Sequence, residues 1–333
     1  MSTIADVAAR AGVSKATASR ALSGRGYVAD ETRRRVSDAA RELSYVAHSS
    51  ATSLATGRTG TIAVIVPSID RWFFAELVAG IHESLLDGDQ DLALYSIRER
   101  SRIRERVFEE VLPRRRFDGL IAAGIQPSAG ELERLIRLGR PLVSVGPCSE
   151  EASAVSIDDA GAARIATEHL LELGHTDIVF VGSGPDHGGS SVGDERRLAG
   201  YREAMIAATA QPRVATACST MVGGYAAAAD LLGDRRSRPT AVVGVCDEAA
   251  IGAIIAARRL GIAVPAQLSV IGIDDHRDAE MFALTTIRQR PREQGRESVR
   301  LLFARLENPD AAIEHVAAAS ALVMRSSTAA PKA

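Results

Sequence analysis

Polar and basic side chains cluster between Lys15 and Arg20, and their types suit contacts with nucleic acid. Arg20 can make a bidentate contact with guanine, the commonest base-specific contact in the DNA major groove. Lys15 and Ala16 are placed for direct readout, although Ala16 offers only a methyl contact to thymine. Thr17 and Ser19 suit phosphate oxygens, which fix register without reading sequence. The stretch predicts a DNA-reading surface, provided that a helix presents it.

Two short helices joined by a turn are predicted to position these side chains. Thr3 can cap a first helix, and Asp6 completes a capping box. Gly12 ends that helix because glycine adopts the left-handed conformation without a Cβ clash. Ser14 then caps a second helix that runs to about Leu22. This is helix-turn-helix spacing, in which the N-terminal residues of the second helix touch base edges. A small helical bundle with solvated arginines is the alternative interpretation.

Charge is divided unevenly along the chain. Residues 1–58 hold nine Lys and Arg against five Asp and Glu, a formal charge of +4, whereas all 333 residues together carry −2. A third helix, predicted over about Asp30–Leu43, places the ridge Arg33-Arg34-Arg35 outward. A basic N-terminal part on an acidic remainder favours a polyanionic partner for the N-terminal part alone.

Composition and cysteine usage argue against several other classes of protein. The sequence has no apolar run long enough for a membrane span and no secretory signal, so we expect a cytoplasmic, nucleoid-associated protein. Cys148, Cys218 and Cys246 lie far apart and are expected to be reduced thiols. The seven His suggest neither a triad nor metal spacing, so we expect no catalytic residue, no metal and no cofactor. The motif Gly182-Ser183-Gly184 is only a weak sign of a dinucleotide loop, because no helix opens after it.

From Thr61 onward, short apolar runs alternate with segments of helical periodicity. Such alternation implies parallel sheets covered on both faces, and two sets of units suggest two doubly wound lobes. Ligands of such sheets bind beyond the carboxyl ends of the strands, which here means the cleft between the lobes. The expected strands are Thr61–Val66, Asp91–Ser96, Gly119–Ala123, Leu142–Val145, Ile178–Val181, Ala241–Val245 and Ser269–Ile273.

A dense series of motifs runs through the N-terminal part: Thr3-Ile4-Ala5-Asp6-Val7-Ala8, Ala11-Gly12-Val13-Ser14, Thr17-Ala18-Ser19-Arg20-Ala21-Leu22, Val28, Thr32-Arg33 and Leu43-Ser44-Tyr45. In these motifs the chain resembles the head of the lactose-repressor (LacI/GalR-type) family of bacterial transcriptional regulators. The family usually has Val where Ala18 and Ala21 stand and Asn where Ser23 stands, which implies looser packing of the second helix. The resemblance implies that the DNA-binding residues are Thr3, Ser14, Lys15, Ala16, Thr17, Ser19, Arg20 and Leu54.

The segment after the head departs further from the family. Tyr45-Val46-Ala47-His48 stands where the family has Tyr-x-Pro-Asn before a short hinge helix. The following Ser- and Thr-rich segment is a poor helix former, which could order only on DNA. By resemblance, Leu54 and its copy in a second subunit would enter the minor groove and kink the duplex. An exposed linker leucine is the alternative.

The body also carries family motifs, among them Val245-Cys246-Asp247, Val264-Pro265, Leu268 to Asp275, Leu284-Thr285-Thr286-Ile287 and Leu322 to Thr328. With the head, the resemblance covers nearly the whole chain, and it implies an effector-binding body like that of solute-binding proteins. By this resemblance, Arg197 and Asp274 bind the effector across the cleft, and Trp72 and Phe73 stack on it. The alternatives are an Arg–Asp salt bridge that holds the lobes together and, for the neighbouring Phe74, a place in the core.

Two departures in the body bear on the effector. The family usually has Asn-Asp where Cys246-Asp247 stands and often has Asp-Arg where Gly146-Pro147 stands, so polar contacts are lost. We expect Cys246 at the site and a sugar, or a related polyol or nucleoside, as effector. An effector that is less polar than a simple hexose, or differently polar, is the alternative.

The expected organisation is an α/β chain with an N-terminal helix-turn-helix head and a two-lobed, periplasmic-binding-protein-like body of doubly wound parallel sheets. We expect a head over residues 1–46, a hinge over 47–60 and a body over 61–333. Lobe 1 takes about 61–158 plus 290–320, and lobe 2 about 159–289 plus 321–328. We expect a homodimer that binds operator DNA as a repressor and makes no contact with a membrane. An enzyme, a secreted solute-binding protein and a regulator with a protein effector are the rival functions.

Overall fold

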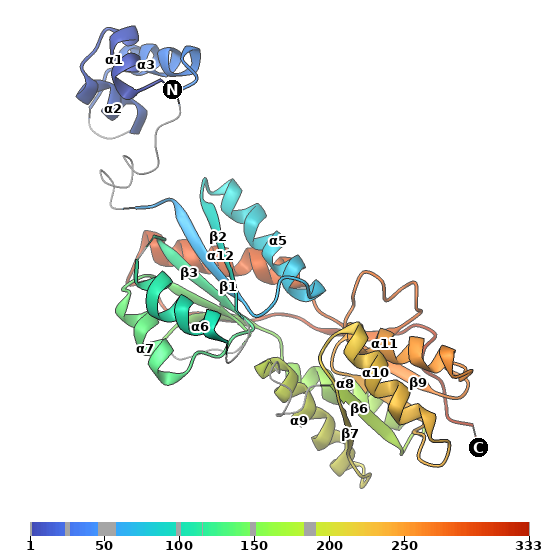
Figure 1. The fold of residues 1–333 in the computed structure, drawn as a ribbon. Helices are drawn as coiled ribbons and strands as arrows, with labels where there is room; N and C mark the ends of the chain where they lie inside the picture. Colours follow the sequence, from blue (N-terminus) through green and yellow to red (C-terminus); the bar gives the residue numbers. More distant parts are fainter. Residues whose placement is uncertain are drawn as a thin grey trace. The chain divides into compact units, whose positions relative to one another are not determined.

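The computed structural model describes residues 2–23, 27–45, 58–97, 101–114, 116–146, 151–182 and 191–332. The chain divides into two compact units, Met1–Gly60 and Thr61–Ala333, which we call the head and the body (Figure 1). The predicted wedge Leu54, most of the predicted hinge, Cys148 and Ser183-Gly184 lie outside the described residues.

The described part of the head is a cluster of three helices. Thr3 and Asp6 form the predicted capping box: the Thr3 N–H donates to Asp6 Oδ2 at 2.8 Å, and the Asp6 N–H donates to Thr3 Oγ1 at 3.4 Å. Gly12 ends the first helix with φ +67°, as predicted. The helices pack around the fully buried side chains of Val7, Ala18 and Val36. Their bounds are α1 Ile4–Ala11, α2 Lys15–Ser23 and α3 Asp30–Glu42.

In the described part of the body, the strands form two six-stranded sheets. The first has the order β11-β5-β4-β3-β1-β2 and the second β12-β10-β9-β8-β6-β7. Every pairing is parallel except that of β10 with β12. The first sheet consists of β1 Thr61–Val66, β2 Asp91–Ser96, β3 Gly119–Ala123, β4 Leu142–Val145, β5 Ser153–Ser156 and β11 His315–Ala317. The second consists of β6 Ile178–Gly182, β7 Arg213–Thr216, β8 Ala241–Gly244, β9 Ser269–Asp274, β10 Thr285–Arg288 and β12 Ala321–Val323.

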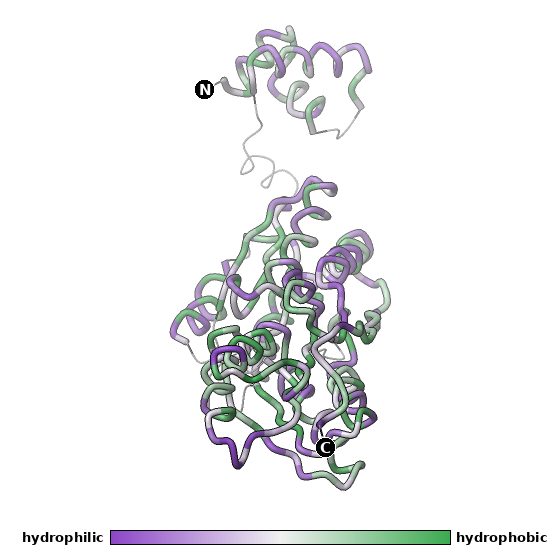
Figure 2. Tube along the Cα trace, turned by 90° about the vertical axis from the view of Figure 1, so that its right-hand side faces the viewer, coloured by the Kyte–Doolittle hydropathy of each residue, from purple (hydrophilic) through white to green (hydrophobic). Residues whose placement is uncertain are grey.

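Helices cover both sheets, so that the apolar strands lie inside and polar residues outside (Figure 2). We call the first sheet with its helices lobe 1 and the second sheet with its helices lobe 2. Lobe 1 carries α5 Trp72–Asp87, α6 Arg102–Arg106, a π turn over Val107–Val111, a 3-10 turn over Leu112–Arg114, α7 Ala129–Arg137 and α12 Pro291–Glu307. Lobe 2 carries α8 Asp159–Glu172, α9 Val192–Ala207, α10 Met221–Gly233 and α11 Asp247–Arg259.

The chain passes between the lobes at three places in the part that the structure describes: from β5 to α8, from β10 to α12 and from β11 to β12. The helices that flank the first two passages pack closely. A Cβ on Gly200 of α9 would lie 2.0 Å from the Ala160 carbonyl oxygen of α8. A Cβ on Gly80 of α5 would lie 2.1 Å from the Arg292 carbonyl oxygen of α12. Glycine is required at both contacts.

The predicted α/β fold class is confirmed, and some element predictions need correction. Helix α5 begins at Trp72, whereas helical periodicity in the sequence predicts a start at about Phe74, with Trp72 on the preceding loop. Strands β5, β7, β10, β11 and β12 were not expected. They are three or four residues long, and β7 alternates in exposure at a sheet edge, so none forms a long apolar run.

Candidate functional site

The predicted DNA-reading residues lie mostly on one face of α2. Lys15, Ala16, Ser19 and Arg20 are exposed, whereas Ala18 and Ala21 of the same helix are buried against the rest of the head. Helical spacing separates the two sets onto opposite faces. The structure therefore presents a small polar and basic surface at the start of α2.

Two of the predicted DNA-binding residues, Ser14 and Thr3, also serve as helix caps. The Ser14 hydroxyl accepts from the Thr17 N–H at 3.1 Å, and the two hydroxyls lie 2.9 Å apart. Thr3 is part of the capping box of α1. Because capping residues fix where a helix begins, these side chains orient the surface as well as adding hydroxyls to it.

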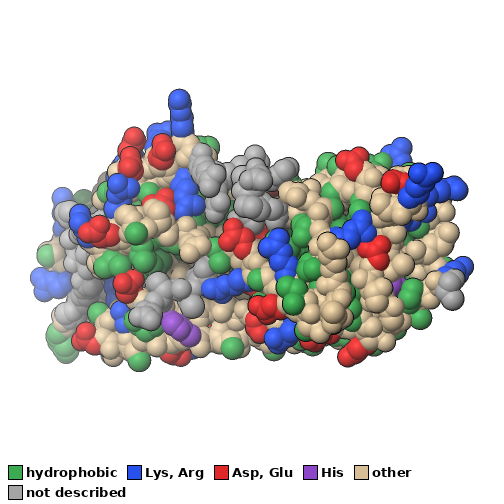
Figure 3. Space-filling view, turned by 90° about the horizontal axis from the view of Figure 1, so that it is seen from below, with side chains coloured by type: hydrophobic (Ala, Val, Ile, Leu, Met, Phe, Trp, Pro, Cys, Tyr) green, Lys and Arg blue, Asp and Glu red, His purple; other side chains and the backbone are tan. Residues whose placement is uncertain are grey.

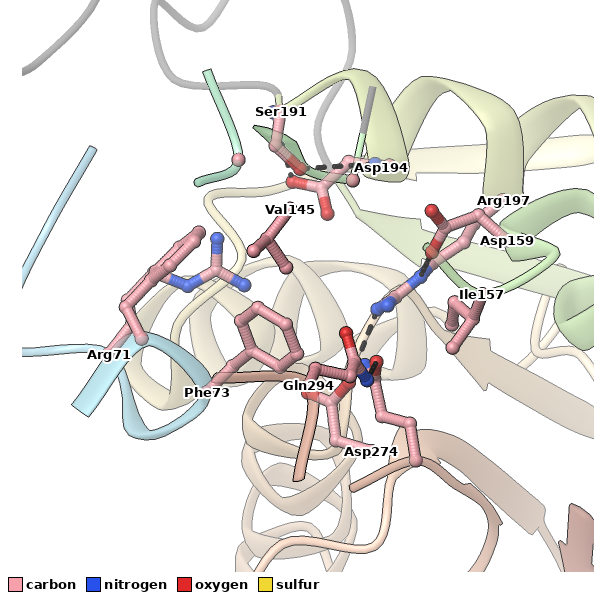
Figure 4. A pocket seen from close by; sticks show the side chains of 15 residues that line it. Arg71, Phe73, Val145, Ile157, Asp159, Ser191, Asp194, Arg197, Asp274 and Gln294 are labelled. Atoms are coloured by element: carbon pink, nitrogen blue, oxygen red, sulfur yellow. Dashed lines mark hydrogen bonds and ion pairs between the residues drawn. The ribbon is translucent and has the colours of Figure 1, made fainter. Parts of the chain in front are cut away.

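A buried cavity lies between the two lobes, at the carboxyl ends of strands from both sheets. Figure 4 shows Arg71 and Phe73 of lobe 1 approaching it from one side and Arg197 and Asp159 of lobe 2 from the other. Asp274, the last residue of β9, and Gln289, just after β10, also line it. The cavity volume is about 60 Å³, which is room for only a few water molecules.

Arg197 is held by a set of contacts within lobe 2. Its Nε donates to Asp159 Oδ1 at 2.8 Å, and its Nη1 donates to the Val245 carbonyl at 2.8 Å and to Asp274 Oδ1 at 3.4 Å. Burial opposes the guanidinium charge, but the carboxylates of Asp159 and Asp274 outweigh burial and hold the pKa of Arg197 above its ordinary value. The Arg197–Asp274 ion pair exists, but both residues belong to lobe 2, so it does not join the lobes.

Asp274 connects this set to lobe 1. Its backbone has φ +138°, a rare conformation for a residue with a side chain. Its Oδ1 accepts from Gln289 Nε2 at 2.6 Å, and Gln289 Oε1 accepts from Gln294 Nε2 of α12 at 3.1 Å. Burial raises the pKa of Asp274 despite the nearby Arg197. The Asp274 carboxyl is thus a buried acceptor that contacts Arg197 of lobe 2 and is linked through Gln289 to Gln294 of lobe 1.

Sequence reasoning missed several cavity residues, notably Arg71, Asp159, Asp194 and Gln289. Asp194 sits in the first turn of α9, where it completes a capping box with Ser191 and accepts from the Ser219 hydroxyl at 2.7 Å. The capping pattern Ser191-x-x-Asp194 is readable in the sequence, but nothing local shows that the helix points at a cavity.

Two predicted effector residues do not line the cavity. The Trp72 ring packs on His276 of lobe 2 with ring centroids 4.8 Å apart. The Cys246 side chain is fully buried, and its Sγ lies 3.6 Å from the Ser219 carbonyl oxygen. Burial raises the pKa of Cys246 to about 12, so it is a neutral thiol at physiological pH.

The remaining surface gives few signs of another chemistry. On the face shown in Figure 3, acidic and basic side chains are interspersed. Among the described residues, no helix combines the length and apolarity that crossing a membrane requires. In the same part of the chain, no three His, Cys, Asp or Glu side chains gather as metal ligands would.

The chain matches two family models. Residues 3–48 match the model described as bacterial regulatory proteins, lacI family, and residues 167–328 match the periplasmic binding protein-like domain. A relative from Bacillus subtilis (strain 168), named HTH-type transcriptional regulator DegA, is 32% identical over 338 residues, 98% of each chain. The HTH-type transcriptional regulator CelR of Thermobifida fusca is 33% identical over 318 residues, 91% of this chain and 92% of the relative.

Solved structures agree with this assignment. The lac repressor dimer bound to operator and the anti-inducer ONPF matches with a TM-score of 0.84 and 28% identity over 99% of each chain. A CelR–cellobiose complex matches with a TM-score of 0.70 and 29% identity, covering 98% of this chain and 100% of that one. A ribose-bound LacI family regulator from Enterococcus faecium matches with a TM-score of 0.73 and 28% identity, covering 82% of this chain and 100% of that one. The chain therefore belongs to the lacI family of bacterial regulatory proteins, and it is a DNA-binding transcriptional regulator with an effector-binding body rather than an enzyme.

Proposed function

We propose that the chain is a homodimeric repressor whose affinity for operator DNA is controlled by a small polyhydroxylated effector, a sugar or a related polyol or nucleoside. One observation carries the proposal: Arg197, Asp159, Asp274 and Gln289 gather in a buried space between two lobes, beside the ring of Phe73. A protein that acts on chromosomal operators works in the cytoplasm, where we place it.

The chemistry of the cavity suits a polyol. A guanidinium and two carboxylates offer charge-assisted hydrogen bonds to vicinal hydroxyls, which both donate and accept. The Phe73 ring offers an apolar face on which the C–H face of a sugar ring or a base can pack. The CelR and Enterococcus faecium structures contain cellobiose and ribose, respectively, which supports a sugar for this chain too.

The size of the cavity suggests how an effector changes the body. The free space of about 60 Å³ is small beside a sugar ring. We therefore propose that an effector favours a body conformation in which the lobes, or the side chains between them, leave more room. An effector that binds this conformation more tightly than the one described shifts the population of body conformations. Coupling of this kind is typically about 1–3 kcal/mol and is reciprocal between effector and DNA.

On the DNA side, we propose that two heads occupy the half-sites of a pseudo-palindromic operator. Helix α2 enters the major groove, where Lys15, Ala16 and Arg20 reach base edges. Thr17 and Ser19 bind phosphates, which positions the head. Leu54 remains the proposed minor-groove wedge, and Leu54→Ala is expected to reduce DNA bending; an unchanged bend angle would remove that role.

A two-step experiment tests the proposal. The full chain is screened by thermal shift against D-ribose, D-glucose, cellobiose, myo-inositol and adenosine, and an operator is selected from random duplex DNA. We expect at least one compound to raise the melting temperature and to change operator affinity by about 5- to 150-fold. A compound that stabilises the body but leaves operator affinity unchanged would contradict the switch.

A further inference from the structure

Arg71 occupies an unusual position in the cavity. It lies in lobe 1, at the N-cap position of α5 directly after the loop that follows β1. Its guanidinium extends into the cavity toward the wall of lobe 2 (Figure 4). The side chain is 15% exposed, so the charge is largely removed from water.

The guanidinium of Arg71 has little hydrogen bonding for so buried a charge. Its Nε is buried without a hydrogen-bond partner. The nearest carboxylate oxygen in the described structure, Glu248 Oε2 of α11, lies 3.7 Å from Nε, and the Phe74 ring lies 5.5 Å from Cζ. A buried charged donor left unpaired is unfavourable, and an arginine offers five donors in a planar fork.

The other cavity arginine differs sharply. Arg197 donates to two carboxylates and a carbonyl, all within lobe 2. The charges that act on Arg71 also lie in lobe 2: although burial lowers its pKa, Asp194, Glu248 and Asp274 raise it above the ordinary value. Arg71 therefore stays charged, with its attraction directed across the cavity and its donors available.

We propose that Arg71 is a specificity-determining residue of the effector site, which donates from lobe 1 to an oxygen atom of an uncharged effector. The inference rests on the proposed function of the cavity and deepens it. When the effector is bound, Arg71 exchanges its long contact with Glu248 for direct hydrogen bonds to a hydroxyl, ring or glycosidic oxygen. Arg71 on lobe 1 then recognises where the effector carries an acceptor oxygen, and the carboxylates on lobe 2 recognise the hydroxyl groups that the effector donates.

The charge of the cavity decides between an uncharged and an anionic effector. Among the described residues that line the cavity, the arginines Arg71 and Arg197 face three aspartates, Asp159, Asp194 and Asp274, for a formal charge of −1. A carboxylate or phosphate on the effector would bring a further negative charge beside these carboxylates in a space shielded from water, where repulsion is strong. The arrangement favours acceptors without charge.

The test compares three variants of the full chain by calorimetric titration. Arg71→Met keeps the apolar stem and removes every donor, and Arg71→Lys keeps the charge but loses the planar fork. Glu248→Gln is the matched control, because it removes the inter-lobe ion pair and leaves Arg71 intact. The probes are D-ribose and cellobiose, with D-ribose 5-phosphate and cellobionate as their charged counterparts. Circular dichroism melts establish that each variant folds.

For a neutral probe that binds the wild type, we expect Arg71→Met to weaken binding by about ten- to a hundredfold. We expect a smaller loss of affinity in Arg71→Lys and a change of no more than about threefold in Glu248→Gln. The wild type should bind the charged counterpart more weakly than the neutral probe. Equal losses in Arg71→Met and Glu248→Gln would show that Arg71 acts only as an inter-lobe ion pair.

Three further outcomes would overturn the idea in distinguishable ways. Wild-type affinity in Arg71→Met would remove Arg71 from the site and leave the proposed function standing. Tighter binding of D-ribose 5-phosphate or cellobionate than of the neutral probe would reverse the charge preference. Failure of both neutral probes, together with the wider screen above, to bind the wild type would overturn the sugar effector itself, and the role of Arg71 with it.

Discussion

The head and the body build their sites in opposite ways. The head presents its polar surface on α2, within 45 residues, and the residues that carry it are exposed neighbours in sequence. The body gathers Arg71, Asp159, Arg197 and Asp274 from segments some two hundred residues apart and buries them. A site that meets a large rigid partner can lie on one helix, whereas a site that encloses a small molecule needs walls from several elements. Variants in one site should therefore leave the other function intact.

The largest expected effect comes from Asp274→Ala in the body. Loss of a buried, hydrogen-bonded carboxylate partner of Arg197 should weaken effector binding by about 30- to 5000-fold, because truncation of such a pair typically costs about 2–5 kcal/mol. Titration calorimetry measures this with a compound found in the thermal-shift screen. Effector-free operator affinity should stay within about twofold of wild type. The exposed Asp230→Ala on α10 is the control. A normal effector response in Asp274→Ala would move the site elsewhere.

Arg20→Ala is the matching change in the head. A bidentate contact to guanine is typically worth about 1–3 kcal/mol of discrimination, so the preference for operator over mutated operator should fall about 5- to 150-fold. Competition binding with single-base operator variants measures it. The exposed Arg34→Ala on α3 is expected instead to weaken binding evenly across sequences. Unchanged discrimination in Arg20→Ala would refute base reading by that side chain.

A smaller effect is expected from Gly12→Ala. Gly12 has φ +67° and open space around its Cβ direction, so the substitution adds backbone strain without a clash. The head should lose about 1 kcal/mol of stability. Hydrogen exchange of the α1 amides measures the loss, while the melting of the body serves as the internal control. A body that melts earlier by the same free energy would show that the two units unfold as one.

The smallest expected effect is a pH dependence confined to the body. Burial lowers the pKa values of His169 and His175 below the ordinary 6.5. Histidines of this kind stabilise the fold above about pH 6.5, and their contribution is lost as the pH falls through the lowered folded value. His175 bonds Thr240, Ser269 and the Ala329 carbonyl, so His175→Gln should be less stable at pH 7.5.

The difference in melting temperature between wild type and His175→Gln should narrow from about pH 7.5 to 5. Asp247 and Asp274 act in the opposite direction, because their raised pKa values favour the folded body at lower pH. Wild type and His175→Gln share this contribution, so it cancels in the difference between their melting temperatures. The described residues of the head up to Tyr45 should not respond in this window, because they contain no His and the pKa of Asp6 lies below its ordinary 3.8. A gap that stays constant with pH would show that His175 does not titrate there.

The contrast between head and body also explains what the sequence could predict. The Thr3 and Ser14 caps, Gly12 and the exposed residues of α2 follow local rules, and the structure agrees with each. In the body, β1, β2, β3 and β4 have the predicted bounds, because each is an apolar run between clear breaks.

The sequence could not identify Asp194 and Gln289 as cavity residues. They line the cavity only because the start of α9 and the crossover from β10 to α12 meet there. Trp72 shows the reverse. As the only tryptophan it attracts attention, yet a helix start two residues earlier than expected directs it toward His276 and away from the cavity lining.

The last two strands have a consequence for synthesis of the protein. β11 forms one edge of the lobe-1 sheet, and β12, which follows closely in sequence, forms one edge of the lobe-2 sheet. A growing chain can complete its head early, but neither sheet has both of its edge strands until β11 and β12 leave the ribosome. A product that terminates before His315 would carry a finished head on two sheets with bare edges at β5 and β10, which invite aggregation. The DNA-binding head is thus made long before the effector-binding body is complete, and without β11 and β12 the head is left with an unfinished body.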